Sequence, residues 1–288
     1  MKEFKDRTAV ITGAASGIGR AIAEQCARES MKVVLADIEE EALSQAEKEM
    51  KAAGASVLAV VTDVSKASDV EALAKKTLAA FGAVHLLCNN AGVGVGGCVW
   101  ECTIEDWKWV LGVNLWGVIN GVRVFVPIML EQDTECHIVN TASGLGLISS
   151  PYLGIYKVTK HAIITLSETL YHELALKCTN IKVSVLCPTW VNTQLLEADR
   201  NRPAKLQNDP DEETRIKTSP EYQEAEIFVR EAVRAGISCQ QVADCLFNAI
   251  RAGKFYILTD PEFVKSMAQL RMEDILQEHS PTNPVPTL

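Results

Sequence analysis

The sequence predicts an α/β protein, with a doubly wound, seven-stranded parallel sheet and helices on both faces. Short β-branched apolar runs alternate with amphipathic stretches along most of the 288 residues. This alternation is typical of parallel strands joined by helices. Apolar residues make up 48% of the chain, which is enough for a large core. We therefore expect a single domain that spans residues 1–288.

Seven apolar runs have the length and the β-branched composition that favour strands. In chain order, the expected strands are residues 8–12, 32–36, 56–62, 84–89, 137–141, 181–187 and 255–258. The amphipathic stretches between them predict helices near residues 18–29, 39–53, 66–81, 104–131, 152–177 and 239–252.

Several expected helix ends carry capping signals. Thr103-x-x-Asp106 and Ser238-x-x-Gln241 resemble capping boxes, in which two side chains and two backbone N–H groups bond reciprocally. Glycines also stand where helix C-caps are expected. They are Gly54, Gly82 and Gly253.

Two segments depart from this rhythm. Residues 197–225 are polar and contain Pro203, Pro210 and Pro220, and they are too long for an ordinary connection. We expect an insertion near residues 194–230 that closes over a substrate, with a disordered surface loop as the alternative. A helix and a proline-rich tail are expected near residues 260–288.

Composition excludes several classes of protein. The net charge of −9 and the lack of a long basic run argue against nucleic acid and anionic membranes as partners. The N-terminus MKEFKDRTAV has no secretory apolar region, and no stretch approaches 18 uninterrupted apolar residues, so we expect a cytoplasmic protein. The nine cysteines form no Cys-x-x-Cys pair, so we expect buried thiols and no metal site.

A cofactor site is predicted at the first strand–helix junction. The run TAVITGAASGIGRAIAE places Gly13, Gly17 and Gly19 there. Glycine lets the backbone approach a pyrophosphate, and the helix N-terminus offers unpaired N–H groups. Asp37, at the end of the second expected strand, can accept both hydrogen bonds of an adenosine ribose diol. Because no cationic residue is available to bind a 2′-phosphate there, the sequence favours NAD over NADP.

The stretch SGLGLISSPYLGIYKVTKHA holds two tyrosines and two lysines, at residues 152, 156, 157 and 160. Only Tyr156 and Lys160 have the i, i+4 spacing that places two side chains on one helix face. An ammonium in that position would lower the pKa of the phenol, as an acid–base group requires. The same spacing also arises by chance in many helices, so spacing alone does not decide between a catalytic pair and an ordinary helix pattern.

The motifs taken together resemble the short-chain dehydrogenase/reductase family over roughly residues 5–195. They are TGAASGIG at residues 12–19, Asp63 with Val64, NNAG at residues 89–92, Asn114, Ser143 and YKVTK at residues 156–160. The resemblance implies a Rossmann-type fold, a nicotinamide cofactor and hydride transfer.

The resemblance also implies roles for individual residues. Tyr156 would be the acid/base, Lys160 would lower its pKa and bind the nicotinamide ribose, and Ser143 would bind the substrate oxygen. Asn114 would anchor a water that extends a proton path from Lys160. The implied cofactor site consists of Gly13, Ser16, Gly17, Ile18, Gly19, Asp37, Ile38, Asp63, Val64, Asn90, Ala91, Gly92, Tyr156, Lys160, Pro188, Val191 and Thr193.

One position departs from the family pattern. Where the family usually has Pro-Gly after the sixth strand, this chain has Pro188-Thr189. The loop that carries Thr193 toward the cofactor is therefore expected to lie differently.

The predicted substrate is a hydrophobic secondary alcohol or ketone. Beside Ser143 and Tyr156, the expected wall residues are mostly apolar and have no arginine or lysine next to them in sequence. They are Leu145, Leu147, Tyr152, Trp190, Leu195 and Leu196. The alternatives are an NADP-dependent carbonyl reductase and a non-catalytic NAD-binding sensor.

Three further patterns have other readings. His161, Glu168 and His172 share a helix face, which is more often solvated than metal-binding. The tryptophans at 100, 107, 109 and 116 could form a substrate wall, but burial at a subunit contact is favoured. The helix over 104–131 is apolar nearly all round, so we expect a homodimer or homotetramer.

Overall fold

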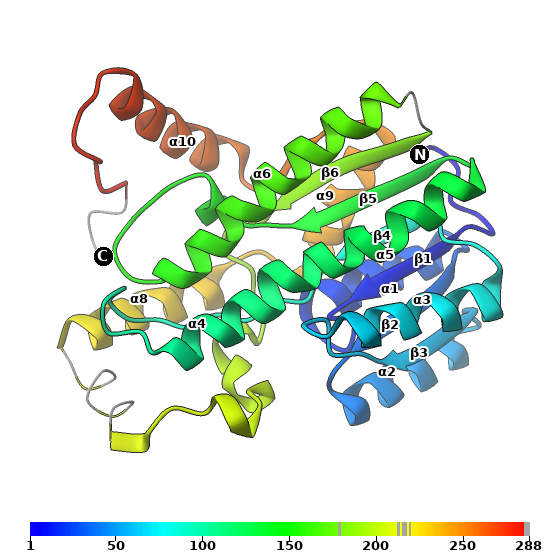
Figure 1. Ribbon diagram of the computed structural model, residues 1–288, viewed down its shortest axis with the longest axis horizontal. Coiled ribbons are helices and arrows are strands. Elements are labelled where there is room, and N and C mark those ends of the chain that lie inside the picture. The colour runs from blue at the N-terminus through cyan, green and yellow to red at the C-terminus, as the bar shows by residue number, and fades with distance from the viewer. Residues whose placement is uncertain (178–179, 212–213, 215–217, 219, 285–288) are drawn as a thin grey trace.

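The computed structural model describes residues 1–177, 180–211, 214, 218 and 220–284. In this part of the chain seven strands form one parallel sheet in the order β3-β2-β1-β4-β5-β6-β7 (Figure 1). The strands are β1 Thr8–Thr12, β2 Lys32–Asp37, β3 Val57–Val61, β4 Leu86–Asn89, β5 Cys136–Thr141, β6 Ile181–Cys187 and β7 Tyr256–Leu258. The predicted doubly wound parallel sheet is confirmed.

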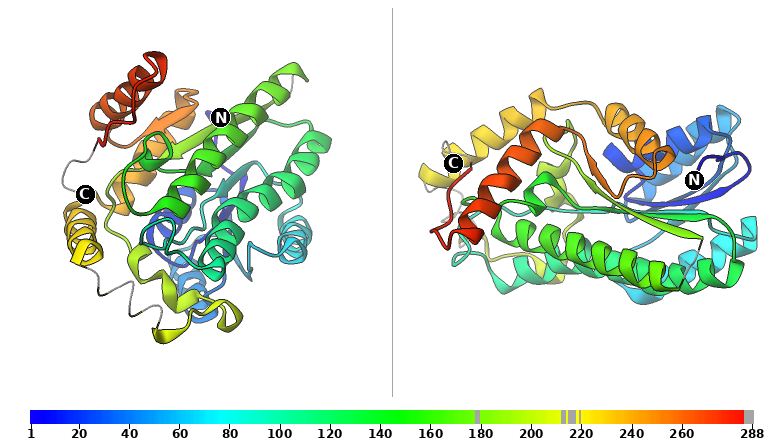
Figure 2. Two further views of the ribbon diagram at one scale, coloured as in Figure 1. Left: turned by 60° about the vertical axis from the view of Figure 1, so that its left-hand side comes forward. Right: turned by 90° about the horizontal axis from the view of Figure 1, so that it is seen from above.

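Helices cover both faces of the sheet (Figure 2). The face with α1 Gly17–Arg28, α2 Glu40–Ala52 and α9 Cys239–Arg251 shares one apolar cluster. The opposite face carries α3 Ala67–Phe81, α5 Gly117–Gln132 and α6 Gly154–Leu176. The remaining helices are α4 Ile104–Val110, α8 Pro220–Ala235 and α10 Pro261–Leu276.

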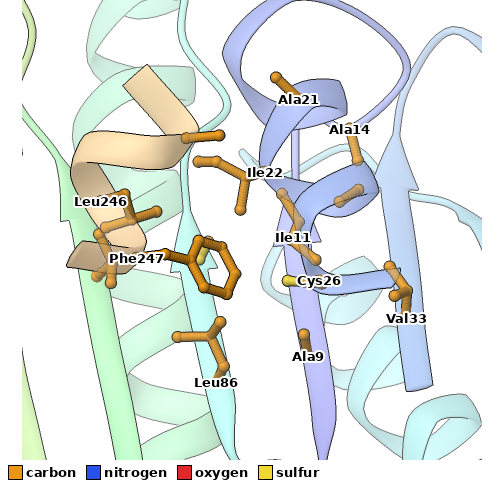
Figure 3. Close-up of a cluster of buried hydrophobic side chains, with 14 of the residues drawn as sticks. Ala9, Ile11, Ala14, Ala21, Ile22, Cys26, Val33, Leu86, Leu246 and Phe247 are labelled. Carbon is orange, nitrogen blue, oxygen red and sulfur yellow. The ribbon is translucent and has the colours of Figure 1, made fainter. Parts of the chain in front are cut away.

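The central strand β1 is buried on both sides because its residues alternate between the two helical layers. Ala9 and Ile11 face α1 and α9, where Ile22 and Phe247 meet them (Figure 3). Val10 belongs to the cluster on the other face. Such two-sided burial explains why the strands read as continuous apolar runs.

Both predicted capping boxes are present, at the starts of α4 and α9. Gly82 is a left-handed C-cap with φ of +78°. Gly54 and Gly253 also have positive φ, one residue beyond the C-caps of α2 and α9. In each case the capping signal in the sequence marked a helix end to within a residue.

The long helix predicted over residues 104–131 is continuous but irregular. Between α4 and α5, residues Leu111–Trp116 form a π-helical turn, and Pro127 lies inside α5. The run Ile104–Gln132 is long and apolar enough to cross a membrane by length and composition alone. Phe125 and Met129 bury part of it against the sheet.

The predicted insertion lies beyond the carboxyl ends of the strands, together with α4 and α8 (Figure 1). Its described residues include the 3-10 helices Leu195–Asn201 and Ala204–Leu206, followed by α8. Closure over a substrate and the alternative of a disordered surface loop both stay predictions. Parts of that prediction, at 212–213, 215–217 and 219, lie outside the described residues, as does the tail at 285–288. The predicted C-terminal helix is present as α10.

Candidate active site

The glycine-rich turn after β1 lies where the strand order reverses, the usual ligand crevice of such sheets. Gly13 and Gly17 have φ of +66° and +57°, which glycine adopts without strain. A Cβ at Gly19 would lie 2.0 Å from the carbonyl oxygen of Gly13, so the turn packs tightly on α1. The side chain of Ser16 does not cap α1. The N–H groups at the start of α1 are thus available to an anionic pyrophosphate.

Asp37 ends β2 beside this turn. One of its carboxylate oxygens accepts a hydrogen bond from Ala15 N at 2.9 Å, and the other accepts from Glu39 N at 3.0 Å. Burial raises the pKa of Asp37 above its ordinary value, although both N–H groups oppose the shift. Each oxygen keeps a second lone pair, so the carboxylate can also accept from a ribose diol.

Asp63 and Val64 follow β3, which pairs with β2, the strand that ends at Asp37. The Oγ of Ser65 and the Nζ of Lys66 donate to the Asp63 carboxylate at 2.6 and 3.1 Å. Burial raises the pKa of Asp63, but these donors outweigh it, so the pKa lies below its ordinary value. Val64 contacts α5 where a Cβ at Gly117 would lie 2.8 Å from its methyl carbon.

Thr12 fixes the chain beyond the carboxyl end of β4. Its Oγ1 accepts from the backbone N–H groups of Asn90 and Ala91 at 2.9 and 3.1 Å. The Asn90 amide in turn donates to the carbonyl oxygen of Thr12 at 3.1 Å and accepts from Thr141 Oγ1 at 3.3 Å. These contacts join the ends of three neighbouring strands beside Gly92.

Asn114 lies fully buried in the π-helical turn, an irregularity that is frequent at functional sites. Its side-chain oxygen accepts from Val93 N at 2.8 Å, and its amide donates to Val93 O at 2.9 Å and to Thr159 Oγ1 at 3.2 Å. Asn114 and Lys160 flank the same glycine, because a Cβ at Gly92 would lie 3.5 and 3.6 Å from their polar ends. The structure thus gives Asn114 a role in holding the chain at Val93, while its role in a proton path stays a prediction.

Ser143, Tyr156 and Lys160 come together at the carboxyl edge of β5. Ser143 follows β5, and its Oγ accepts from Leu145 N at 3.2 Å and donates to Pro188 O at 3.4 Å. Tyr156 lies in the first turn of α6. The Lys160 Nζ donates to Thr141 O at 3.0 Å and lies 5.3 Å from the centre of the Tyr156 ring. Tyr156 and Lys160, the pair with i, i+4 spacing, therefore lie beside Ser143.

The expected lowering of the phenol pKa is wrong. Burial raises the pKa of Tyr156 to about 12, although a hydrogen bond with Ser143 opposes the shift. Burial also lowers the pKa of Lys160 to about 8. The ammonium contacts the ring face and a backbone carbonyl rather than the phenol oxygen, so loss of hydration dominates.

The loop after β6 carries Thr189 at the position where the family usually has glycine. Thr189 N donates to Thr259 Oγ1 at 3.1 Å, which ties the loop to the end of β7. Val191 bridges to Ile237. Thr193 nevertheless reaches the glycine turn, since a Cβ at Gly17 would lie 3.6 Å from its methyl group. Thr193 therefore lies beside the glycine turn, while the expected difference of this loop from that of the family stays a prediction.

A cavity of about 480 Å³ runs along this edge of the sheet, a volume typical of small-ligand sites. Most predicted cofactor residues line it together with Ser143, Tyr156 and Lys160. The lining cofactor residues are Gly13, Ser16, Gly17, Ile18, Asp37, Ile38, Asp63, Val64, Asn90, Ala91, Gly92, Pro188, Val191 and Thr193. Gly19 and Asn114 are buried behind the lining.

The predicted substrate wall is largely present. Leu145, Tyr152, Trp190, Leu195 and Leu196 line the cavity. Leu147 does not, because it packs against the core cluster around Val118 and Ile163, so its assignment to the wall is wrong.

Side chains that the sequence did not point to complete the far end of the cavity. Trp109, expected at a subunit contact, is buried and lines the cavity, whereas Trp100 and Trp116 are 83% and 53% exposed. Val93, Val95 and Tyr222 line it as well. The alternation of valine and glycine after the NNAG motif was the only signal for the two valines, and Tyr222 gave none.

A buried ion pair also borders the cavity. Arg202 Nη2 lies 2.8 Å from Asp106 Oδ1, and both side chains are almost fully buried. Asn208 donates to Asp106 and accepts from Arg202, each at 3.0 Å. The guanidinium lies over the ring of Trp109. The sequence gave no sign of this cation at the cavity, because Arg202 is not adjacent in sequence to a predicted wall residue and its partner Asp106 is 96 residues away.

The suspected metal face of α6 is occupied by other contacts. His161 Nδ1 donates to Lys157 O at 2.9 Å, and Glu168 accepts from the hydroxyl group of Tyr256. Among the described residues no group of three or more His, Cys, Asp or Glu side chains could hold a metal ion.

Known proteins are similar to this chain over nearly its whole length. The family model described as short chain dehydrogenase matches residues 7–204. A CLA biosynthesis dehydrogenase/reductase of Lactiplantibacillus plantarum is 34% identical over 98% of this chain and 97% of its own. A 1-deoxy-11-beta-hydroxypentalenate dehydrogenase of Streptomyces exfoliatus is 32% identical, covering 94% of this chain and 87% of its own.

A solved structure agrees with these matches. A short-chain dehydrogenase/reductase from Burkholderia phymatum, in complex with NAD, is 48% identical with a TM-score of 0.93 and covers 99% of both chains. The parallel sheet, the glycine turn and the Ser–Tyr–Lys group at the carboxyl edge define an oxidoreductase of the Rossmann class. The chain belongs to the short-chain dehydrogenase/reductase family.

Proposed function

We propose that the protein is an NAD-dependent oxidoreductase that transfers a hydride between the nicotinamide and a hydrophobic secondary alcohol or ketone. The observation that carries this proposal is the meeting of Ser143, Tyr156 and Lys160 on a cavity that continues to the glycine turn. Bound NAD would accept or supply the hydride. The residues of the chain have to move the accompanying proton.

Tyr156 is the proposed acid/base. Its raised pKa keeps the phenol protonated at neutral pH, which is the form that donates a proton to a ketone oxygen. Ser143 orients the same oxygen from the end of β5. Lys160 favours the phenolate when an alcohol is oxidised, since its ammonium lies against the Tyr156 ring.

The preference for NAD over NADP rests on Asp37 and its surroundings. A carboxylate at the end of β2 can accept from a ribose diol and repels a 2′-phosphate. Arg200 lines the cavity, but its Nη2 donates to Glu39 at 2.7 Å and its Nη1 donates to Glu197 O at 2.9 Å. Arg200 is thus already engaged. The relative from Burkholderia phymatum binds NAD, which supports the same choice.

The apolar walls support a hydrophobic substrate. Trp109, Trp190 and Leu196 surround the cavity near the Ser143–Tyr156 pair. A polar sugar or a phosphate would leave hydrogen-bonding groups unpaired there, at about 1–3 kcal/mol each. The name of the Streptomyces exfoliatus relative refers to a hydroxylated substrate, which fits the oxidation of an alcohol.

A panel of secondary alcohols and ketones, assayed with NAD, NADH, NADP and NADPH, tests the proposal through the absorbance of the reduced cofactor. We expect turnover with NAD or NADH and the highest kcat/KM for hydrophobic cyclic or medium-sized substrates. Binding of NAD without turnover of any substrate would instead favour the non-catalytic sensor. Turnover only with NADPH would favour the carbonyl reductase.

We also propose that α8 and its neighbours in residues 194–230 close over the substrate. α8 contributes Tyr222, Ala225 and Val229 to the cavity lining, and its Arg230 forms an exposed ion pair with Glu197 of the preceding segment. Proteolysis with and without NAD plus a substrate analogue measures this closure. Equal cleavage rates between Glu197 and Glu226 in both states would exclude it.

A homodimer or homotetramer is proposed from the outer face of α5 and α6. Trp116, Val158 and Tyr171 are 53%, 48% and 45% exposed on this layer. Large exposed apolar side chains on one helical layer fit a contact with a second subunit. Light scattering at micromolar concentration is expected to give at least twice the mass of one chain, and a monomer would contradict the proposal.

A further inference from the structure

Lys157 follows Tyr156 in sequence and has no part in the acid–base chemistry. Its side chain is only 5% exposed, and no carboxylate in the described residues pairs with its ammonium. Instead Nζ donates to three consecutive carbonyl oxygens, Ser150 O at 2.8 Å, Pro151 O at 3.0 Å and Tyr152 O at 2.6 Å. An ammonium has three N–H donors, so the turn uses all of them.

The turn that these bonds hold is strained. Tyr152 and Leu153 have φ of +53° and +52°, a left-handed conformation that is strained for non-glycine residues. Two such residues in succession persist only where surrounding contacts determine them. The three bonds from Lys157 and the bond from its backbone N to Leu153 O at 2.9 Å are hydrogen bonds that α6 makes to this turn.

The turn also decides where a wall of the substrate cavity stands. Tyr152, Leu153 and Ile148 line the cavity that contains Ser143 and Tyr156. The neighbouring Gly154 is packed closely, since a Cβ there would lie 2.4 Å from a methyl carbon of Val99. A change in the backbone at residues 150–153 therefore moves the wall relative to the reacting groups.

We propose that Lys157 is a positioning residue: its buried ammonium holds the left-handed turn that sets Tyr152 in the substrate wall. The inference rests on the proposed function, because its first two tests measure KM for the substrate. Burial lowers the pKa of Lys157 to about 8, so the ammonium form predominates at neutral pH. The purely structural reading is that Lys157 only satisfies buried carbonyl groups.

The first test replaces Lys157 by Met, which keeps the length of the side chain and removes the three donors. We expect KM for the best substrate of the panel to rise about tenfold or more, because small displacements in a site have large effects on binding and rate. The Kd for NAD and the kcat should stay within about threefold of wild type, since a wall residue acts on substrate binding. Lys76→Met, on the exposed side of α3, is the matched control.

The second test asks whether the effect passes through the strained turn. Glycine adopts positive φ without strain, so Leu153→Gly should reduce the need for Lys157. In a double-mutant cycle, Lys157→Met should therefore raise KM less in the Leu153→Gly background than in wild type. Equal effects in the two backgrounds would mean that Lys157 does not act through the turn, and would overturn the proposal.

Hydrogen exchange of a peptide over residues 147–153 gives a measurement that needs no turnover. We expect faster exchange there in Lys157→Met and unchanged exchange in β1 and α1. If wild type turns over no substrate, the proposed function fails while this measurement still decides the role of Lys157. If Lys157→Met folds poorly, Lys157→Gln, which keeps two N–H donors, should give the same changes at smaller size. Wild-type exchange and KM in whichever variant folds would overturn the proposal.

Discussion

The cofactor end and the substrate end of the cavity are built in different ways. At the cofactor end, backbone conformation and hydrogen bonds to backbone N–H groups shape the site: Gly13 and Gly17 have positive φ, and Asp37 accepts from the N–H groups of Ala15 and Glu39. At the substrate end, side chains that are far apart in sequence meet, as Asp106 and Arg202 do. The first end depends on backbone conformation and on hydrogen bonds that involve backbone groups, whereas the second depends on contacts between side chains.

This difference predicts that substitutions at the two ends impair different properties of the protein. Changes at the cofactor end should weaken NAD binding and leave the fold stable. Changes at the substrate end should lower stability, because they disturb contacts that hold the insertion on the domain. Tyr156 stands between the two ends and should affect neither property.

The largest expected effect is therefore that of Tyr156→Phe. The ring still packs, but no proton can be transferred, and general acid–base groups contribute about 10²- to 10⁴-fold. We expect kcat to fall by at least 100-fold while the NAD Kd and the melting temperature stay near wild type. Steady-state kinetics and NAD titration measure both. Retention of more than about a tenth of kcat would show that the proton moves by another route.

The pH dependence of wild type checks the same assignment. Oxidation of an alcohol needs the phenolate, and the pKa of Tyr156 is raised, so the oxidation rate should increase with pH through the alkaline range. Reduction uses the phenol and should not increase. An oxidation rate that is already maximal at neutral pH would mean that the phenol ionises there when cofactor is bound.

The second largest effect is expected for Arg202→Met. Removing one partner of a buried ion pair typically costs about 3–5 kcal/mol, because the other charge stays buried without its partner. Denaturant unfolding should show this loss for the single variant and a smaller one for Arg202→Met combined with Asp106→Asn. A single variant as stable as wild type would mean that the pair does not hold the insertion.

Asp37→Ala should have an intermediate effect, and on affinity rather than stability. Hydrogen bonds to a charged group contribute about 1.5–3 kcal/mol, so NAD affinity should fall by about tenfold or more. The preference over NADP should narrow, since repulsion of a 2′-phosphate is also lost. Titrations with both cofactors measure the change, and an unchanged ratio of the two affinities would contradict the assignment.

The smallest effect is expected for Arg230→Gln. Arg230 pairs with Glu197 and Glu226 at 3.1 and 2.9 Å, but these side chains are about half exposed. Exposed pairs contribute about 0–1 kcal/mol. Unfolding in denaturant should therefore change by less than about 1 kcal/mol. A loss as large as that of Arg202→Met would remove the distinction between a firmly held segment at 195–208 and a loosely attached α8.

The same distinction explains what the sequence could predict. Strands, capping boxes and the glycine turn follow from local patterns, and the structure contains them at or near the predicted residues. Arg202 was missed because its partner Asp106 is visible in sequence only as a capping residue. Leu147 was misplaced because sequence proximity to Ser143 does not show which way a side chain points. The pKa of Tyr156 was misjudged because its dominant cause, burial, is a property of the whole fold.

The strand order has a consequence for how the chain reaches this structure. β1 pairs with β2, the next strand in the chain, but its other neighbour is β4. The pairing of Ala9 with Leu86 therefore joins residues that are far apart in sequence. Val185 of β6 likewise pairs with Tyr256 of β7, which is far away in sequence. Pairings this distant make folding slow, because the entropy of loop closure is lost before the contacts form. During synthesis, one edge of β1 therefore stays open until β4 has emerged, and an open strand edge can pair with other chains.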